Sequence, residues 1–261
     1  TPQFCEDEVN YITSIGGIDI KYGQEMGKDF TLADLQQQYD AVYLAFGVGV
    51  ARQLDIPGEN LEGVVDAISF IYDIRTKDFS QITVGDKVAV IGLGMTAIDA
   101  ATQAKRLGAK EVSIVYRRTY DEKPCTDVEL DIAKLDGCNL VWLAAPKEVV
   151  GVDGKVTELV CSVMELGAAD ASGRRSPVDT GKTFSLAVDM VIKAAGQVPF
   201  SSLVAGSSLE NKSGKIVVTG KSKTNIEGVF AGGDAVNGGK EVVDAVQAGK
   251  DGAKDIIEFL A

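Results

Sequence analysis

A short glycine turn holds the residues of this chain that are best suited to bind a phosphorylated ligand. The stretch 87–101 reads KVAVIGLGMTAIDAA, in which a β-rich apolar run is followed at once by glycines and then by small helix-forming residues. A strand, a tight glycine turn and a helix in this order form the context in which a G-x-G-x-x-G/A match indicates dinucleotide binding. The alternative is a glycine turn inside an ordinary α/β unit. The candidate binding residues are Gly92, Gly94, Met95, Thr96 and Ala97.

The small residues of this turn have separate physical roles. Gly92 permits the sharp turn, Gly94 lacks a Cβ where a pyrophosphate must approach the backbone, and Ala97 lets the helix pack closely on the strand. The N-terminus of the following helix offers free N–H groups and a partial positive charge to a diphosphate. The turn therefore predicts a site for the diphosphate of a dinucleotide.

Two arginines after the next predicted strand bear on which dinucleotide is bound. The run EVSIVY ends at residue 116, and Arg117 and Arg118 follow it, the first of them 25 positions after Gly92. NAD-binding units carry an acidic residue near this point, which accepts a hydrogen bond from the ribose 2′-hydroxyl. Two guanidinium groups instead suit charge-assisted contacts with a 2′-phosphate. The pair predicts NADP(H) over NAD(H), with two ordinary surface arginines as the alternative.

The composition excludes several other kinds of chemistry. The 261 residues include no histidine, so imidazole-based metal sites and Ser-His-Asp triads are excluded within this sequence. The formal net charge is −12 without a long basic run, which argues against nucleic acid or an anionic membrane as a partner. The four cysteines lack C-x-x-C spacing and predict reduced thiols of a cytoplasmic protein, with no disulfide frame and no metal site.

The remaining periodicity predicts an α/β fold around the glycine turn. Helices are expected near 1–15, 32–35, 64–74, 128–135 and 241–260, and strands near 18–22, 40–47, 140–143, 190–194, 215–219 and 228–231. Gly47 ends one of these strands, either as a position of close backbone approach or as a plain turn.

From residue 146 onward the pattern predicts an antiparallel meander of about three strands. The expected strands cover 148–152, 155–166 and 184–188. Asp153-Gly154 is a strong hairpin signal between the first two. The polar segment 167–182 is expected to be a loop, in which Arg174 and Arg175 are solvated surface rather than a site.

Several stretches, in the same order, resemble one family. They read VAVIGLGMTAIDAATQAKRLGAKEVSIVYRR, ELGAADASGRR, VIKAAGQVP and GVFAGGDAVNGGKEVVDAVQAGKDGA. Almost from end to end, the chain resembles the FAD- and NADPH-dependent oxidoreductases of the glutamate synthase small subunit type. This type also forms the flavin/NADPH part of dihydropyrimidine dehydrogenase. The resemblance implies an NADPH domain inserted into an FAD domain. It also implies that hydride passes from nicotinamide to flavin, and electrons onward to iron–sulfur clusters or a partner subunit.

The resemblance also implies roles for individual residues. It implies that the glycine turn is the NADPH pyrophosphate loop, although Met95 stands where the family usually has asparagine. It implies that the two arginines are the 2′-phosphate clamp. Three further positions are implied to meet the cofactors, namely the strand end at Gly196 and Gln197, the GGD motif at Gly233 and Asp234, and the helix start at Val242. The strand end lies where the chain returns from the NADPH domain to the FAD domain, and the GGD motif and the helix start lie beside the flavin. Asp234 has a simpler alternative, which is to cap a turn.

The expected architecture is an α/β protein with a Rossmann-like NADPH domain at 79–200, which includes the meander. Residues 1–78 and 201–261 are expected to form an incomplete FAD-binding domain, because the family's first βαβ unit, with its own G-x-G-x-x-G, is missing. The chain thus resembles a piece of a longer flavoprotein.

The alternative to an oxidoreductase function is a module that binds NADP(H) and catalyses nothing. A thioredoxin-reductase-like enzyme is set aside because it needs a C-x-x-C motif. The final electron acceptor stays open, with glutamate synthesis and pyrimidine reduction as candidates.

Overall fold

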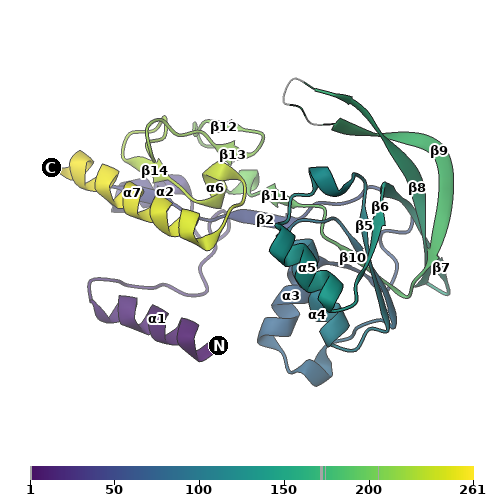
Figure 1. Cartoon of the computed structure of the whole chain (residues 1–261). Helices are drawn as coiled ribbons and strands as arrows, with labels where there is room; N and C mark the ends of the chain where they lie inside the picture. The colour runs from purple at the N-terminus through teal and green to yellow at the C-terminus, as the bar shows by residue number, and fades with distance from the viewer. Residues whose placement is uncertain (1, 171–172, 174, 205) are drawn as a thin grey trace. The chain divides into compact units, whose positions relative to one another are not determined.

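A five-stranded parallel sheet carries the glycine turn (Figure 1). A computed structural model describes residues 2–170, 173, 175–204 and 206–261 of the chain. The strand order in the sheet is β3-β10-β4-β5-β6, with β4 at the centre. The bounds are Val64–Asp66 for β3, Met190–Lys193 for β10, Lys87–Ile91 for β4, Glu111–Tyr116 for β5 and Asn139–Trp142 for β6. After β4 the chain adds β5 and β6 on one side of it, and only after the meander does it add β10 on the other side. The direction in which strands are added to the sheet therefore changes beside β4.

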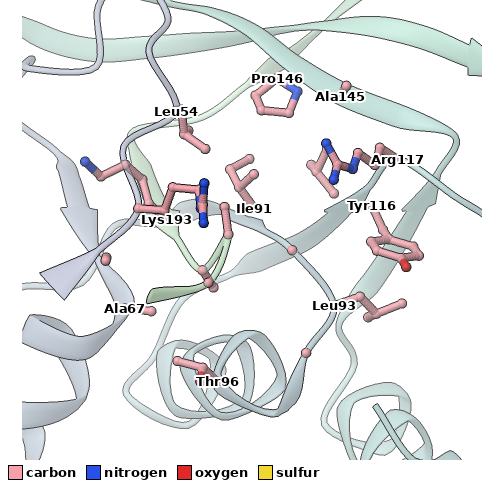
Figure 2. A pocket seen from close by; sticks show the side chains of 18 of the residues that line it. Leu54, Ala67, Ile91, Leu93, Thr96, Tyr116, Arg117, Ala145, Pro146 and Lys193 are labelled. Carbon is pink, nitrogen blue, oxygen red and sulfur yellow. The ribbon is translucent and has the colours of Figure 1, made fainter. Parts of the chain in front are cut away.

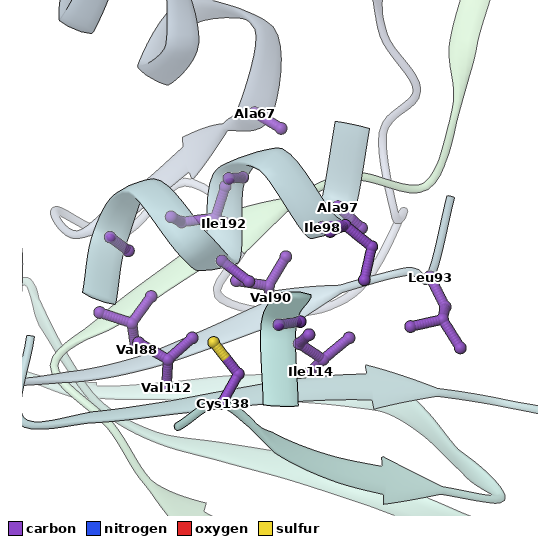
Figure 3. Packing of buried hydrophobic residues seen from close by; sticks show 14 of the residues in the cluster. Ala67, Val88, Val90, Leu93, Ala97, Ile98, Val112, Ile114, Cys138 and Ile192 are labelled. Carbon is purple, nitrogen blue, oxygen red and sulfur yellow. The ribbon is translucent and has the colours of Figure 1, made fainter. Parts of the chain in front are cut away.

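Helices cover one face of the sheet because alternate residues of its strands are apolar on that side. The helices are α3 (Ala67–Thr76), α4 (Met95–Arg106) and α5 (Asp127–Leu135). Val88 and Val90 of β4 and Ile114 of β5 pack against the alanine-rich face of α4, where Ala97 and Ala101 are fully buried (Figure 3). Side chains this small let the helix axis approach the sheet closely, as the sequence predicts for Ala97.

The antiparallel meander covers the opposite face. Its strands are β7 (Ala144–Val152), β8 (Lys155–Ala169) and β9 (Arg175–Ala187). Ala89 and Ile91, which alternate with the valines of β4, pack with Leu159 and Cys161 of β8. The predicted hairpin turn is confirmed, because Val152 pairs with Lys155, and Asp153 and Gly154 have φ of 52° and 81°, the positive values of a type I′ hairpin turn.

The chain divides into two compact units. One is Gly49–Val198, and the other comprises the residues up to Val48 together with Pro199–Ala261. The first unit thus begins well before residue 79, where the sequence predicts the NADPH domain to start. The physical reason is that β3 pairs with β10 in the parallel sheet and α3 packs against α4. The chain passes between the units in β2 (Val48–Ala51) and β11 (Gln197–Pro199), which pair with each other.

The second unit is built on a short parallel pair, β1 (Val42–Leu44) with β14 (Val229–Ala231). The long helix α7 (Val242–Leu260) contacts β14, and the Tyr43 hydroxyl donates a 2.8 Å hydrogen bond to the Ala248 carbonyl of α7. The other elements of this unit are α1 (Pro2–Ser14), α2 (Leu32–Gln38), β12 (Asn211–Lys212), β13 (Lys215–Ile216) and α6 (Asp234–Asn237), together with the 3₁₀ turn η3 (Ser201–Val204). None of the described helices is long and apolar enough to cross a membrane.

The structure corrects some of the predicted elements. Residues 64–66 form a strand rather than the start of a helix, because their backbone pairs in register with β10. No strand forms at 18–22. Most of the described part of 167–182 is strand, since its backbone extends the β8–β9 pairing toward the hairpin tip. Arg174 lies outside the described residues. Arg175 begins β9, where it forms an ion pair with Glu122 and is not simply solvated.

Candidate functional site

A cavity of about 740 Å³ opens at the carboxyl edge of the parallel sheet. The ends of β10, β4 and β5 meet there, beside the central strand where the winding changes direction. This is the position where open α/β sheets bind their ligands. Figure 2 shows Arg117 on the side of Ala145 and Pro146, with Leu54 and Lys193 across the cavity. All the residues that line the cavity belong to the unit Gly49–Val198.

The two fingerprint glycines are required for different reasons. Gly92 has φ of +122°, and a Cβ on it would lie 2.4 Å from the carbonyl oxygen of Ala194 at the end of β10. A side chain is therefore excluded by the protein itself. Gly94 has an ordinary φ of −81°, and its missing Cβ would meet nothing within 4 Å. Because Gly94 lines the cavity, the space its hydrogen leaves is free for a ligand to approach the backbone.

The N-terminus of α4 faces this space with its N–H groups uncapped. Gly94 is the N-cap residue and has no side chain with which to accept a hydrogen bond from them. Thr96 lines the cavity, and Ala97 is fully buried beneath it. Met95 is not among the cavity-lining residues, and its side chain is 43% exposed. Met95, the first residue of α4, thus lies outside the cavity.

The two arginines lie at the other end of the cavity in different states. Both line it, directly after the end of β5. Arg117 is exposed, and its guanidinium has no ion-pair or hydrogen-bond partner within the part of the chain that the structure describes. Arg118 is only 9% exposed, and its Nε donates a 3.1 Å hydrogen bond to the carbonyl of Arg175. Within the described residues, the two predicted arginines are therefore one unpaired cation and one anchored cation.

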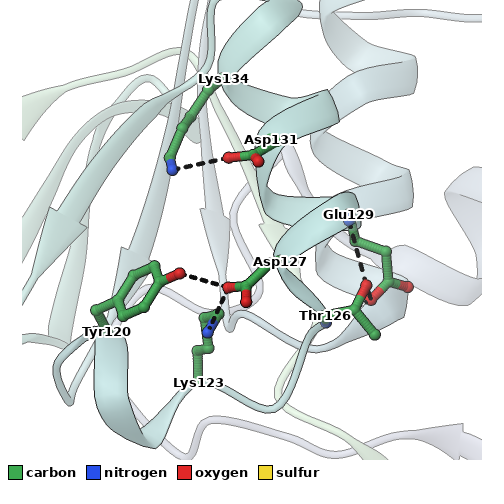
Figure 4. Close-up of polar contacts among 7 residues, drawn as sticks. All are labelled: Tyr120, Lys123, Thr126, Asp127, Glu129, Asp131 and Lys134. Carbon is green, nitrogen blue, oxygen red and sulfur yellow. Dashed lines mark hydrogen bonds and ion pairs between the residues drawn. The ribbon is translucent and has the colours of Figure 1, made fainter.

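The loop that carries the arginines is held by its own polar contacts. Thr119 and Glu122 form a capping box around the 3₁₀ turn η2 (Tyr120–Glu122). Thr126 and Glu129 form a second capping box at the start of α5 (Figure 4). Between them, Lys123 pairs with Asp127 at 2.8 Å and lies 3.8 Å from the centre of the Tyr120 ring. The backbone downstream of the arginines is therefore fixed at both ends of η2.

A buried ion pair at the opposite end of the cavity escaped the sequence analysis. Lys193, the last residue of β10, lies 2.9 Å from the Glu59 carboxylate, with both side chains largely buried. Its Nζ also donates a 2.8 Å hydrogen bond to Gln53. Burial raises the pKa of Glu59. Hydrogen bonds from the Leu54 N–H, from Lys193 and from the Asp55 N–H lower this pKa by more, so the carboxyl lies below its usual range. The pair fixes the segment 52–59, part of which lines the cavity.

Gly196 and Gln197 also line the cavity, as part of the segment after β10. Gly196 has φ of +98°, and its carbonyl accepts a 2.9 Å hydrogen bond from the Arg52 N–H. The Gln197 side chain donates a 2.9 Å hydrogen bond to the Gly49 carbonyl. The structure therefore brings together the fingerprint, the arginines and this strand end around one cavity.

The remaining predicted site residues lie in the other unit. Gly47 has φ of +72° with nothing within 4 Å of a Cβ, so the turn and not a close protein contact requires glycine. Gly233 has φ of 64° and ψ of −149°, a conformation essentially restricted to glycine. The Asp234 carboxylate accepts a 3.0 Å hydrogen bond from the Lys240 N–H. Asp234 thus closes a turn, the alternative role considered for it. Val242 begins α7 with its side chain 79% exposed.

Comparison with known proteins gives consistent matches. The sequence pattern of the family described as pyridine nucleotide-disulphide oxidoreductase matches residues 5–249. NADP(+)-dependent formate dehydrogenase subunit beta of Moorella thermoacetica is 35% identical over 257 residues, which cover 97% of this chain and 36% of that protein. Glutamate synthase (NADPH) small chain of Azospirillum brasilense is also 35% identical, over 89% of this chain and 51% of that protein. The chain thus spans about a third to a half of the length of these relatives.

Among solved structures, FprA of Mycobacterium tuberculosis in complex with NADPH superimposes with a TM-score of 0.74 at 22% identity, covering 90% of this chain and 67% of that one. This likeness shows the shared fold and confirms the expected α/β class. The family match covers the first three segments on which the resemblance was based in full, and the fourth except for residues 250–253. The chain therefore belongs to the pyridine nucleotide-disulphide oxidoreductase family, among relatives of the glutamate synthase small chain.

Proposed function

We propose that the unit Gly49–Val198 binds NADP(H) across the carboxyl edge of its parallel sheet. The diphosphate lies against Gly94 and the uncapped N-terminus of α4, and the 2′-phosphate is bound by Arg117 and Arg118. The observation that carries this proposal is that the Arg117 guanidinium, which has no partner among the described residues, lies in the same cavity as the glycine turn. An arginine without a partner among the described residues, in one cavity with an uncapped helix N-terminus, suits a dinucleotide with an additional phosphate.

We further propose that the whole protein is an NADPH-dependent flavin oxidoreductase. The family membership supports this, as do relatives named as NADPH-dependent subunits, such as the NADPH-Fe(3+) oxidoreductase subunit beta of Geobacter sulfurreducens. When bound, NADPH and FAD would supply hydride-transfer chemistry, and on this proposal the electrons would go on to iron–sulfur clusters or a partner subunit. The chain contributes cofactor choice and orientation. On this proposal, Gly233, Asp234 and the start of α7 at Val242 belong to the flavin site.

A second candidate function is a module that binds NADP(H) without activity. It is motivated by the single dinucleotide fingerprint in this sequence. The absorbance spectrum of the purified protein distinguishes the two. A bound-flavin band, with NADPH-driven reduction of a dye, supports the oxidoreductase. A colourless protein that still binds NADPH supports the module.

The NADP(H) site itself is tested by titrating NADPH and NADH into the protein and into the Arg117→Ala/Arg118→Ala variant. One charge-assisted hydrogen bond contributes about 1.5–3 kcal/mol, which corresponds to about 10- to 150-fold in affinity. We expect the double substitution to weaken NADPH binding by at least that factor and to change NADH binding little. Equal losses for both nucleotides would contradict the assignment of the arginines to the 2′-phosphate.

A further inference from the structure

A contact network joins the anchored arginine of the site to the β8–β9 hairpin. Arg175, the first residue of β9, accepts the hydrogen bond of the Arg118 Nε through its backbone carbonyl. Because the Arg118 Nε is used in this hydrogen bond, the terminal amino groups of its guanidinium remain to donate hydrogen bonds to a ligand. The hairpin thus fixes a cavity-lining side chain that lies 57 residues away in the sequence.

The side chain of Arg175 makes a second contact, with a carboxylate of the loop that carries the two arginines. Its Nε donates a 2.6 Å hydrogen bond to Glu122, and its Nη2 forms an ion pair with the same carboxylate oxygen. The Glu122 side chain is 9% exposed. Its other carboxylate oxygen accepts hydrogen bonds from the N–H and the hydroxyl of Thr119. Glu122 is therefore held in place with its charge directed at Arg175.

The charges of this loop explain why such a contact matters. Residues 117–122 contain two arginines, Asp121 and Glu122, so the loop alone is neutral. Arg175 adds one positive charge, forming an ion pair with Glu122 and lying 3.8 Å from the Asp121 carboxylate. Without it, Glu122 would be a largely buried carboxylate with no ion-pair partner among the described residues, on the loop that carries the two arginines. Such a charge attracts the guanidinium of Arg118 and repels the phosphate.

We propose that Arg175 is a positioning residue for 2′-phosphate recognition: it fixes Arg118 through its carbonyl and neutralises Glu122 through its guanidinium. This inference rests on the proposed NADP(H) site. It assigns part of the cofactor preference to a residue of the meander that does not line the cavity.

The test measures the affinities of NADP⁺ and NAD⁺ for the wild-type protein and four variants. Arg175→Gln removes the charge of Arg175 but keeps its backbone. Glu122→Gln/Arg175→Gln removes both charges, and Arg175→Lys keeps the positive charge. Arg106→Gln is the matched control, because Arg106 also pairs with a carboxylate, that of Asp136 at 2.7 Å, at the C-terminal end of α4 and away from the cavity. Thermal unfolding of each variant shows whether it is folded.

We expect Arg175→Gln to weaken NADP⁺ binding by about tenfold, the loss for one impaired charge-assisted contact, with NAD⁺ binding changed less than about twofold. The double variant should recover most of the NADP⁺ affinity, because the unpaired carboxylate is gone. Arg175→Lys should retain most of it, and Arg106→Gln should bind as the wild type does.

Two results would overturn the inference. If Arg175→Gln weakens both nucleotides equally, or if the double variant binds NADP⁺ no better than Arg175→Gln, then Arg175 only braces the hairpin. A wild-type protein that binds NADP⁺ and NAD⁺ equally would overturn the proposed function itself, and this inference with it. The wild-type ratio therefore separates the two failures.

Discussion

The two fingerprint glycines allow folding and ligand binding to be separated by matched substitutions. In Gly92→Ala, the new Cβ would lie 2.4 Å from the Ala194 carbonyl oxygen and 3.0 Å from its carbon, with φ at +122°. Backbone strain of this kind costs about 1–3 kcal/mol, and displacing packed neighbours costs about 1–3 kcal/mol more. We therefore expect Gly92→Ala to lower the free energy of unfolding by roughly 2–6 kcal/mol, a large part of a typical total of about 5–15 kcal/mol.

Gly94→Ala should behave in the opposite way. Its φ of −81° suits any residue, and its Cβ would point into open space. The free energy of unfolding should change by no more than about 0.5 kcal/mol. The methyl group would instead occupy the space proposed for the diphosphate, so NADPH binding should weaken by about 10- to 100-fold, or about 1.4–2.8 kcal/mol.

Urea unfolding followed by circular dichroism gives the stability of both variants, and calorimetric titration with NADPH gives the affinity of Gly94→Ala. The reasoning would be refuted in one of two ways. Gly94→Ala could bind NADPH as tightly as the wild type, which would place the diphosphate elsewhere. Gly92→Ala could unfold at the wild-type urea concentration, which would show that the turn tolerates a side chain.

Two further predictions concern the ion pair beside the cavity and the packing of α7. The pKa of Glu59 is lowered in the folded state from its ordinary value of 4.5. The ionised Glu59 carboxylate therefore contributes fully to the free energy of unfolding above pH 4.5, and this contribution is lost as the pH falls through the lowered pKa. The difference in unfolding free energy between the wild type and Glu59→Gln should therefore shrink in acid, and a difference independent of pH would exclude a stabilising ion pair with Lys193. In α7, Gly252→Ala would place a Cβ 2.0 Å from the Tyr43 ring and should lower the free energy of unfolding by about 1–3 kcal/mol. The new Cβ of Gly249→Ala would meet nothing within 4 Å, so this substitution should raise the free energy of unfolding by about 0.5–1 kcal/mol. Melting temperatures that fall for both variants would contradict this packing.

Local signals in the sequence were sufficient to predict the glycine turn and its flanking elements. The expected strand at 111–116 is β5, and the helices expected at 128–135 and 241–260 correspond to α5 and α7. Each of these elements has its own apolar period or capping residues, so its conformation is determined by neighbours in the sequence. The hairpin at Asp153-Gly154 is predictable for the same reason.

Features that depend on distant partners could not be predicted in this way. The strand β3 is only three residues long and is strand because β10, more than 120 positions later, pairs with it. Glu59 and Lys193 are 134 positions apart, and no local pattern at either position indicates that the two side chains pair. The different states of Arg117 and Arg118 depend on the carbonyl of Arg175 in the meander. A charged pair brought together by tertiary structure has no signal in a single sequence.

The most direct test of the NADP(H) site is the ratio of the dissociation constants of NADH and NADPH for the wild-type protein, measured at one fixed ionic strength. Arg117 has no partner within the described residues, so a 2′-phosphate would give it one without breaking an existing contact. We predict that NADPH binds at least about tenfold more tightly than NADH, which corresponds to about 1.4 kcal/mol. Equal affinities for the two nucleotides would contradict the assignment of this cavity to NADP(H).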